Sequence, residues 1–260
     1  MDKNSILKAF SEENPHVISK IIDDIELCFD IDFVVFSNSF YPANIWTKLL
    51  SLSHSLGVNI LTYGLNDNCE KKLLGFYPKT LDLAPELLIP DTTFFKIDGS
   101  NKFNTLLHKD FLGAIMSLSI KRELLGDLVV KNSICYGITT KEIFKILKDN
   151  LKSIGKVPIN IDEISNENIP KTEFQSLIIT VSSLRFDVII AEIANISRNE
   201  AVSKIENGEA LLNYNYCRDK SFPIKEDDVI TIRKKGKFIF ENSLGENKKG
   251  KFKLAIKQVI

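Results

Sequence analysis

The sequence predicts an α+β protein with three consecutive units: a small N-terminal α/β region, a ferredoxin-like middle domain, and a C-terminal module of two helices and several strands. A length of 260 residues is typical of two or three compact units. Segments with helical spacing of apolar residues alternate along the chain with short segments rich in β-branched residues. In the middle of the chain the order is β-α-β-β-α-β, which is that of a ferredoxin-like fold.

The N-terminal α/β region is expected over residues 1–75. Asn14 and Pro15 predict the start of a helix, because asparagine favours the N-cap and proline the first helical position. Gly57 predicts the end of a second helix, since glycine adopts the left-handed conformation that terminates helices. The other expected elements are a strand at 32–37, the second helix at 41–57 and a strand at 58–63.

The middle domain is expected over residues 76–165. Thr139 and Glu142 fit a capping box for its second helix, and Gly155 is expected to end that helix. Asn132-Ser133 lies between two extended segments and predicts a hairpin. The expected strands and helices are at 93–98, 108–119, 128–138, 139–155 and 157–164. An open sheet of this kind is a recurring platform for RNA, although the fold alone names no function.

Lys121 and Arg122 directly follow the first helix of the middle domain, and Gly126-Asp127 then turns the chain into the next strand. Cations at this place complement the dipole of the preceding helix, so a purely structural role would explain them. A direct contact with RNA would explain them equally well. The sequence leaves both interpretations open.

Residues 166–180 are expected to form a short connector, because their first half is polar and contains a proline. The C-terminal module then spans 181–260. Its first helix is expected from Leu184 to Ala194, and Ser197 with Glu200 fits a capping box for the second. Arg198 therefore lies in the first turn of a helix, where its positive charge opposes the dipole. This position favours a bound anion such as phosphate.

Basic residues are concentrated toward the end of the chain. The net charge is zero, with 34 basic and 34 acidic residues, but residues 1–100 contain 8 basic and 14 acidic residues. From Val229 onward there are 9 basic and only 2 acidic residues. The segment "DDVITIRKKGKF", residues 227–238, is expected to be a strand that carries Arg233, Lys234, Lys235 and Lys237 to one edge. This asymmetry is expected of a chain that contacts a polyanion with its C-terminal part. Taken alone, a lysine-rich terminus that is only solvated would explain it as well, so both interpretations stay open.

Several classes of protein are not favoured by the sequence. There is no apolar run of about 18 residues, and the first residues are charged, so we expect neither a membrane span nor secretion but a cytoplasmic protein. Cys28, Cys69, Cys135 and Cys217 are widely spaced, which disfavours zinc. We find no glycine-rich cofactor loop and no catalytic nucleophile. We therefore expect no enzymatic activity, no catalytic residues, no metal, no cofactor and no small-molecule substrate.

The C-terminal module resembles the S-four RNA-binding domain. That pattern reads R-L-D, S-R-x-x-A, I-x-x-G, V-x-V-N, P and G-D. The matching positions here are Arg185-Phe186-Asp187, Ser197-Arg198 with Ala201, Ile205 with Gly208, Ala210 and Leu212 with Asn213, Pro223, and Asp227-Asp228. Phe186, Ala210 and Asp227 depart from the pattern, and Asp227 replaces a glycine in a turn.

A longer part of the chain, roughly 75–255, resembles the YlmH family of bacterial RNA-binding proteins. The segments that carry this resemblance are "LLHKDFLGAIMSLSIKRELLGDLVV", "TVSSLRFDVIIAE" and the K-K-G-K tail from Lys248 to Lys251. The family pattern R-G-x-G-R-F reads "RKKGKF" here, so that Lys234 replaces a glycine and Lys237 an arginine. The first 75 residues carry less of the family signature.

The resemblance implies a non-catalytic protein that binds ribosomal RNA and transfer RNA on the large ribosomal subunit, in quality control of stalled nascent chains. Alternatives are an RNA-modifying enzyme or its accessory, such as a pseudouridine synthase-like protein, and a scaffold linked to cell division. Too little chain follows the R-F-D segment for a pseudouridine synthase. The expected RNA-binding residues are Arg185, Asp187, Ser197, Arg198, Lys204, Asn213, Arg233, Lys235, Lys237, Lys121, Arg122, Lys248, Lys249 and Lys251.

Overall fold

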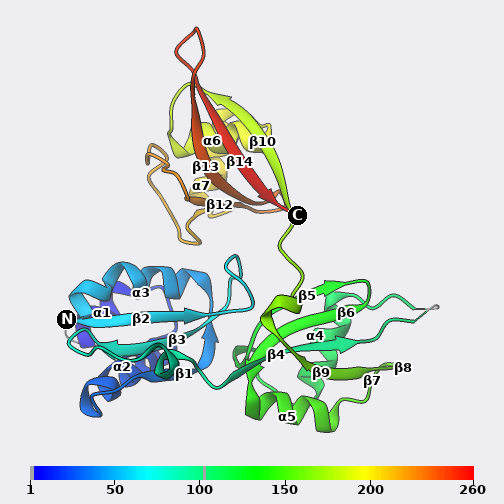
Figure 1. The fold of residues 1–260 in the computed structure, drawn as a ribbon. Coiled ribbons are helices and arrows are strands. Elements are labelled where there is room, and N and C mark those ends of the chain that lie inside the picture. Colours follow the sequence, from blue (N-terminus) through cyan, green and yellow to red (C-terminus); the bar gives the residue numbers. More distant parts are fainter. Residues whose placement is uncertain (1–2, 102–103) are drawn as a thin grey trace. The chain divides into compact units, whose positions relative to one another are not determined.

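Helices and antiparallel strands form two units in the computed structural model, which describes residues 3–101 and 104–260 (Figure 1). The first unit is Met1–Pro170 and the second is Lys171–Ile260. The α+β class that the sequence predicts is confirmed. In the part of the chain that the structure describes, every helix is too short or too polar to cross a membrane.

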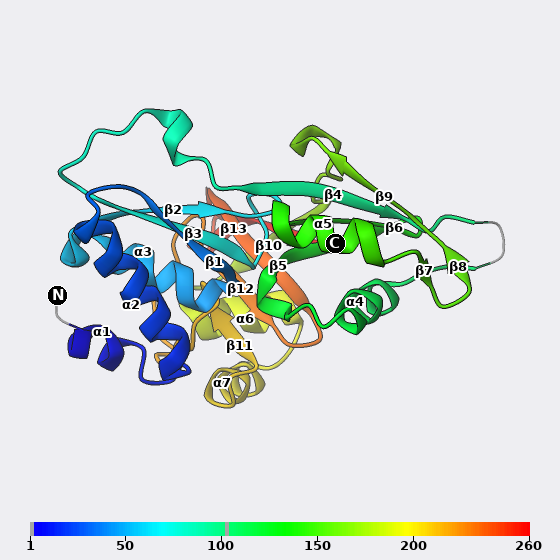
Figure 2. The ribbon, with the colours of Figure 1, turned by 90° about the horizontal axis from the view of Figure 1, so that it is seen from below.

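The first unit begins with a three-stranded sheet in the order β1-β3-β2. Three helices cover one face of this sheet (Figure 2). The elements are α1 (Lys3–Ala9), α2 (Pro15–Asp30), β1 (Val35–Tyr41), α3 (Ala43–Leu56), β2 (Val58–Tyr63) and β3 (Lys72–Pro78). Asn14 caps α2 by accepting a hydrogen bond from the His16 N–H at 3.0 Å. Gly57, with φ 73°, ends α3. Both helix signals in this region are thus confirmed.

A four-stranded sheet follows, in the order β5-β6-β4-β9. Its elements are β4 (Thr92–Asp98), α4 (His108–Ser117), β5 (Leu125–Lys131), β6 (Ile134–Thr140), α5 (Lys141–Asn150) and β9 (Asn160–Ile164). The predicted order β-α-β-β-α-β is confirmed, and α4 and α5 lie on one side of the sheet (Figure 2). The hairpin at Asn132-Ser133 is confirmed as well, since φ is 53° and 59° at these residues, as a type I′ turn requires.

The boundaries of the second helix in this sheet differ from the prediction. Thr140, not Thr139, is the N-cap of α5, and its hydroxyl accepts a hydrogen bond from the Ile143 N–H. The helix ends at Asn150, before a short hairpin formed by β7 (Ser153–Ile154) and β8 (Val157–Pro158). Gly155, with φ 58°, lies in the turn of that hairpin. Gly155 therefore forms the turn between β7 and β8 and does not end α5.

The two sheets of the first unit share an apolar cluster. Phe40, Leu65 and Leu73 from the N-terminal part pack with Ile138 and Ile169. Because β3 runs through residue 75, the boundary expected there falls inside a strand.

A polar contact adds to this junction. The Asp127 carboxylate accepts hydrogen bonds from the Glu70 and Lys71 N–H groups. Gly126 beside it is closely packed, since a Cβ there would lie 2.4 Å from Ile138. The Gly126-Asp127 pair that the sequence singles out therefore joins the two parts of this unit.

The second unit contains a five-stranded sheet in the order β10-β14-β13-β12-β11, packed against two helices. Its elements are β10 (Phe174–Val181), α6 (Phe186–Ala194), α7 (Arg198–Glu206), β11 (Ala210–Leu212), β12 (Val229–Ile232), β13 (Gly236–Glu246) and β14 (Phe252–Val259). The prediction of a connector over 166–180 is wrong in its second half, because β10 pairs with β14 from Phe174 onward. Ile179 and Val181 of this strand are buried in the core.

Candidate nucleic-acid interface

Two arginines of the second unit are held by one buried carboxylate. Arg185, the N-cap residue of α6, donates from Nε to Asp187 Oδ1 at 3.1 Å and from Nη2 to Oδ2 at 3.2 Å. Arg198, the first residue of α7, donates from Nε to Asp187 Oδ2 at 2.9 Å. The Asp187 side chain is 1% exposed, whereas those of Arg185 and Arg198 are 37% and 57% exposed. Asp187 therefore holds one edge of each guanidinium, while much of each arginine side chain remains open to solvent.

The charge on Asp187 is maintained by its partners. Burial raises the pKa of this carboxyl, but the hydrogen bonds from Arg185 and Arg198 outweigh burial and hold the pKa below its ordinary value. The Val188 N–H also donates to Oδ1 at 3.0 Å. Asp187 thus remains ionised at neutral pH and holds both guanidiniums in one orientation.

This arrangement corrects the expectation for Arg198. The sequence suggests that only a bound anion compensates its position in the first turn of α7. In the structure the Asp187 carboxylate already provides a negative partner, at the start of the neighbouring helix. Arg198 therefore has a structural role, and any contact with phosphate must use its remaining N–H groups.

The local sequence explains how the starts of α6 and α7 approach each other. Asn195, with φ 52°, ends α6, and two residues later Ser197 caps α7. The predicted capping box is confirmed: Glu200 N–H donates to Ser197 Oγ at 3.2 Å, and Ser197 N–H donates to Glu200 Oε2 at 2.8 Å. Ala201 is fully buried. Its small side chain allows the helices to pack closely.

The loop before β12 covers the start of α6. The Phe186 N–H donates to the Phe222 carbonyl and the Asp187 N–H to the Lys220 carbonyl, both at 3.0 Å. These amide groups of α6 are therefore already paired. An anion at this place would be bound by the arginine side chains and not by these two backbone groups.

Two further predicted residues are tied into the turns of this unit. Asn213, with φ 48°, donates from Nδ2 to Asp228 Oδ1 at 2.8 Å and accepts from the Val229 N–H at 2.9 Å. Lys204 donates to Glu209 Oε2 at 2.8 Å. Asp227 has φ 68°, so the turn keeps the left-handed conformation that glycine provides in the S-four pattern. These contacts give Asn213 and Lys204 structural roles.

The basic segment after β12 is a turn and not the end of a strand. β12 stops at Ile232, and Lys234 and Gly236 have φ of 65° and 114°. The prediction that a strand carries Arg233 and Lys235 is therefore wrong, because the chain reverses at these residues to form the β12–β13 hairpin. Lys234 nevertheless adopts the left-handed conformation expected of the glycine that it replaces. The Lys237 ammonium lies 5.0 Å from the centre of the Tyr214 ring.

Lys248, Lys249 and Lys251 lie at the tip of the β13–β14 hairpin, where all three are exposed. Asn247 shapes this tip, because its Oδ1 accepts hydrogen bonds from the Lys249 and Lys251 N–H groups. Figure 1 shows the hairpin extending beyond the other strands of its sheet. The three lysines therefore form a protruding basic tip.

Lys121 and Arg122 belong to the first unit, whereas the other predicted residues belong to the second unit. Arg122 Nη1 donates to the Gly126 carbonyl at 3.1 Å, and Lys71 Nζ donates to the Arg122 carbonyl at the same distance. These contacts give Arg122 a structural role at the start of β5, which differs from the contact with the preceding helix dipole that the sequence suggests.

The open face of the middle sheet is partly covered. Phe94 and Tyr136, the aromatic residues on this face, are half-buried against the cluster that includes Phe40 and Leu65. A cavity of about 780 Å³ lies elsewhere in the same domain, between α4 and the β7–β8 hairpin. No local pattern in the sequence predicts this cavity, because its walls come from segments about 40 residues apart.

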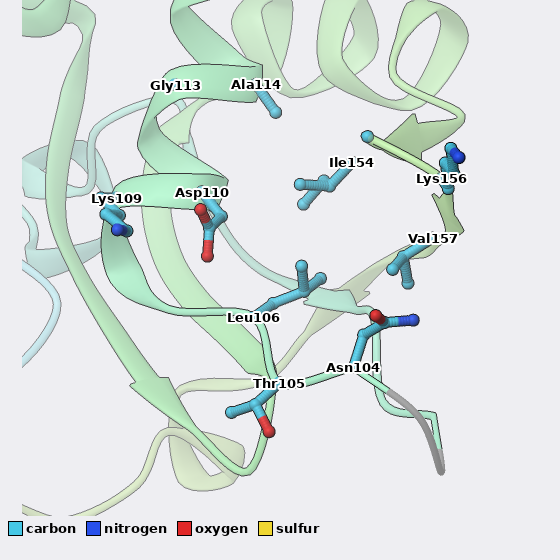
Figure 3. Close-up of a pocket in the computed structure, with 11 residues that line it drawn as sticks. Asn104, Thr105, Leu106, Lys109, Asp110, Gly113, Ala114, Ile154, Lys156 and Val157 are labelled. Carbon is cyan, nitrogen blue, oxygen red and sulfur yellow. The ribbon is translucent and has the colours of Figure 1, made fainter.

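Figure 3 shows how the cavity is lined. The side chains of Leu106, Ile154 and Val157 point into it. Lys109, Asp110, Lys156, Asn104 and Thr105 also line it. Among residues 3–101 and 104–260, no group of three or more His, Cys, Asp and Glu side chains gathers as a metal site would require.

A family model and a curated relative agree with the family resemblance. Residues 91–168, which contain β4 to β9 and the cavity, match a family model described as the putative RNA-binding domain in YlmH. The ribosome-associated protein quality control protein P2 of Bacillus subtilis (strain 168) is 28% identical over 183 residues, covering 68% of this chain and 71% of the relative. A solved structure, the cell division protein ylmH from Streptococcus pneumoniae, is 23% identical with a TM-score of 0.49 and covers 59% of this chain and 92% of its own.

Proposed function

Because the chain belongs to the YlmH family, we propose that it is an RNA-binding protein that acts in ribosome-associated quality control. Its RNA ligands are ribosomal RNA and transfer RNA on the large ribosomal subunit. The observation that carries the proposal is the pair of exposed arginines, Arg185 and Arg198, fixed by the buried Asp187.

This arrangement suits phosphate recognition. A guanidinium binds phosphate through a planar set of N–H donors, and its orientation decides how many of them reach the oxygens. Asp187 fixes both orientations before RNA arrives, which lowers the entropy lost on binding. Arg185 and Arg198 are then available for neighbouring phosphates of a folded RNA.

Basic residues in two hairpins of the second unit offer further contacts for RNA. Arg233 and Lys235 lie in the β12–β13 turn, and Lys248, Lys249 and Lys251 at the tip of the next hairpin. Exposed lysines contact phosphates without reading the sequence. The resemblance of this unit to S-four domains supports the same assignment.

The middle domain supports RNA binding independently, because the family model for a putative RNA-binding domain matches residues 91–168. The half-buried Phe94 and Tyr136 leave less of its sheet open for bases than a bare sheet would offer. The cavity beside α4, which lysines and apolar side chains line, is a second place where this domain can meet a nucleotide.

We further propose that the protein is not an RNA-modifying enzyme. A pseudouridine synthase uses an aspartate in a context similar to Arg185-Phe186-Asp187. Here Asp187 is 1% exposed and hydrogen-bonded to two arginines, so its carboxylate is not accessible to attack a base. No specific contact favours the cell-division scaffold.

Sucrose-gradient sedimentation of a cell extract, followed by sequencing of the RNA bound to the protein, tests the proposal. The protein should sediment with large subunits and retain ribosomal and transfer RNA. The variant with both Arg185→Ala and Arg198→Ala should move to the top of the gradient. The control is Lys257→Ala, which also removes a positive charge from this unit. Because Lys257 is paired with Glu241, this variant should sediment like the wild type.

A further inference from the structure

An apolar surface with an acidic border lies at the C-terminal end of α2. Four large apolar side chains are exposed within seven residues: Leu27 at 46%, Phe29 at 46%, Ile31 at 51% and Phe33 at 39%. Single exposed apolar residues are common, but a group of them marks an interaction site more often than chance. We call these four residues the α2-end patch.

The local backbone explains why the patch is exposed. Cys28 and Val34 are buried at 0% and 8%, and all five residues between them are exposed. The Ile31 N–H donates to the Leu27 carbonyl at 3.0 Å and the Phe33 N–H to the Cys28 carbonyl at 3.3 Å. These bonds turn the chain over the end of α2, where residues 29–33 remain exposed.

The charged residues that flank the patch along the chain are acidic. Asp30 and Asp32 alternate with its apolar residues, and Glu26 precedes it on the helix; all three are exposed. Residues 21–47 contain no Lys, Arg or His, whereas they contain five acids: Asp23, Asp24, Glu26, Asp30 and Asp32. Such a surface repels the phosphates of RNA.

The acids also oppose the dipole of α2. A helix favours cations in its last turn, but α2 has no basic residue there and ends in Asp30. The negative end of the dipole and the carboxylates therefore attract an external cation to the border of the patch. The negative charge favours a partner with cationic side chains, and the apolar centre favours a partner that also carries apolar ones.

We infer that the α2-end patch docks a lysine- or arginine-rich protein segment that also carries apolar side chains, on the surface of the ribosomal subunit. The inference rests on the proposed function. In this account the acidic N-terminal part of the chain contacts protein, and the basic C-terminal part contacts RNA. Apolar anchors such as Phe29 and Ile31 would enter the partner, and Glu26 and Asp30 would pair with its cations.

The experiment compares two probes: purified large ribosomal subunits, and ribosomal RNA freed of protein from the same subunits. The full-length variant Phe29→Gln with Ile31→Gln should bind intact subunits about tenfold more weakly or worse, because interface anchors dominate affinity. Its affinity for bare RNA should equal that of the wild type. Leu87→Gln, at 45% exposure in the same unit, is the matched control and should change neither affinity.

Reversing the border charge distinguishes protein from RNA as the occupant. Glu26→Lys with Asp30→Lys should weaken binding to intact subunits, whereas RNA at the patch would make binding tighter. This pair places cations at the C-terminal end of α2, which the helix dipole favours, so the variant should melt no earlier than the wild type. The charge-reversal variant therefore distinguishes protein from RNA as the occupant of the patch even if the Phe29 and Ile31 variant unfolds.

Several outcomes would overturn the inference. Unchanged binding of both variants to intact subunits would do so, as would an equal loss on bare RNA. A wild-type dimer that the Phe29 and Ile31 variant abolishes would assign the patch to a second copy of the chain. If the wild type binds neither probe, the proposed function itself fails and the inference fails with it.

Discussion

The carboxylate of Asp187 accepts a hydrogen bond from Nε of Arg198 at 2.9 Å, although the two residues are 11 positions apart. Arg185 donates hydrogen bonds to both oxygens of the same carboxylate. The residues that resemble the R-x-D and S-R elements of a sequence pattern are therefore parts of one ion-pair cluster. This cluster both holds α6 against α7 and orients two guanidiniums.

Replacing Asp187 with asparagine should destabilise the second unit. The change keeps the size of the side chain but removes the charge that holds two arginines, which typically costs about 1.5–3 kcal/mol. Because the folded pKa of Asp187 is depressed, its contribution is present above the unfolded pKa and is lost as pH falls through the folded pKa. Urea unfolding should show a constant deficit at pH 6–8 that shrinks in acid. A deficit that is the same at all pH values would contradict this account.

Arg198→Ala should cost stability, contrary to what the sequence alone suggests. The substitution leaves the buried Asp187 with Arg185 as its remaining ionic partner, so a loss of about 1–2 kcal/mol is expected. Ser197→Ala removes the cap of α7 and should cost about 1 kcal/mol. Thermal melting compares the two, and only Arg198→Ala should also weaken RNA binding. An Arg198→Ala variant as stable as the wild type would contradict the ion-pair role.

Removing the basic tip should change how affinity depends on salt. Each phosphate contact releases counterions, so the slope of log affinity against log salt reports the number of contacts. The triple variant Lys248→Ala, Lys249→Ala, Lys251→Ala should reduce that slope by up to about three units. Filter binding to ribosomal RNA at several salt concentrations measures it. An unchanged slope would show that these exposed lysines are only solvated.

Asp24 should make the first unit less stable as pH rises. Burial, and then the neighbouring charge of Asp23, raise the pKa of this carboxyl to about 6. The folded state therefore binds a proton more tightly than the unfolded state, and stability falls between pH 3.8 and about 6. Asp24→Asn should remove this fall and raise Tm by a few degrees at pH 7. A variant with the same pH profile as the wild type would contradict the assignment.

Local signals in the sequence were read correctly where short-range physics determines the structure. The Ser197 and Glu200 capping box and the Asn132-Ser133 hairpin depend on residues within one turn, so their chemistry alone predicts them. The strand β10 was missed because its partner β14 is about 80 residues away and supplies the pairing that its polar start does not suggest.

The candidate site was predicted only in part for the same reason. Arg185, Asp187 and Arg198 were identified individually, but nothing in their spacing shows that one buried carboxylate binds both arginines. The turn at Lys234 was read as a strand, because a left-handed lysine gives no signal of the kind that glycine gives. The α2-end patch was also missed, since nothing in the local sequence shows which of these apolar side chains stay exposed in the fold.

The affinity of the Arg185→Ala and Arg198→Ala double variant for large ribosomal subunits, measured at a fixed salt concentration, tests the central claim most directly. The account predicts that each single variant binds roughly tenfold more weakly and the double variant on the order of a hundredfold, because each loses a charge-assisted contact with phosphate. The control Lys257→Ala should bind like the wild type. A double variant that remains folded and binds within about twofold of the wild type would contradict the claim, and would leave the arginines as structural partners of Asp187 only.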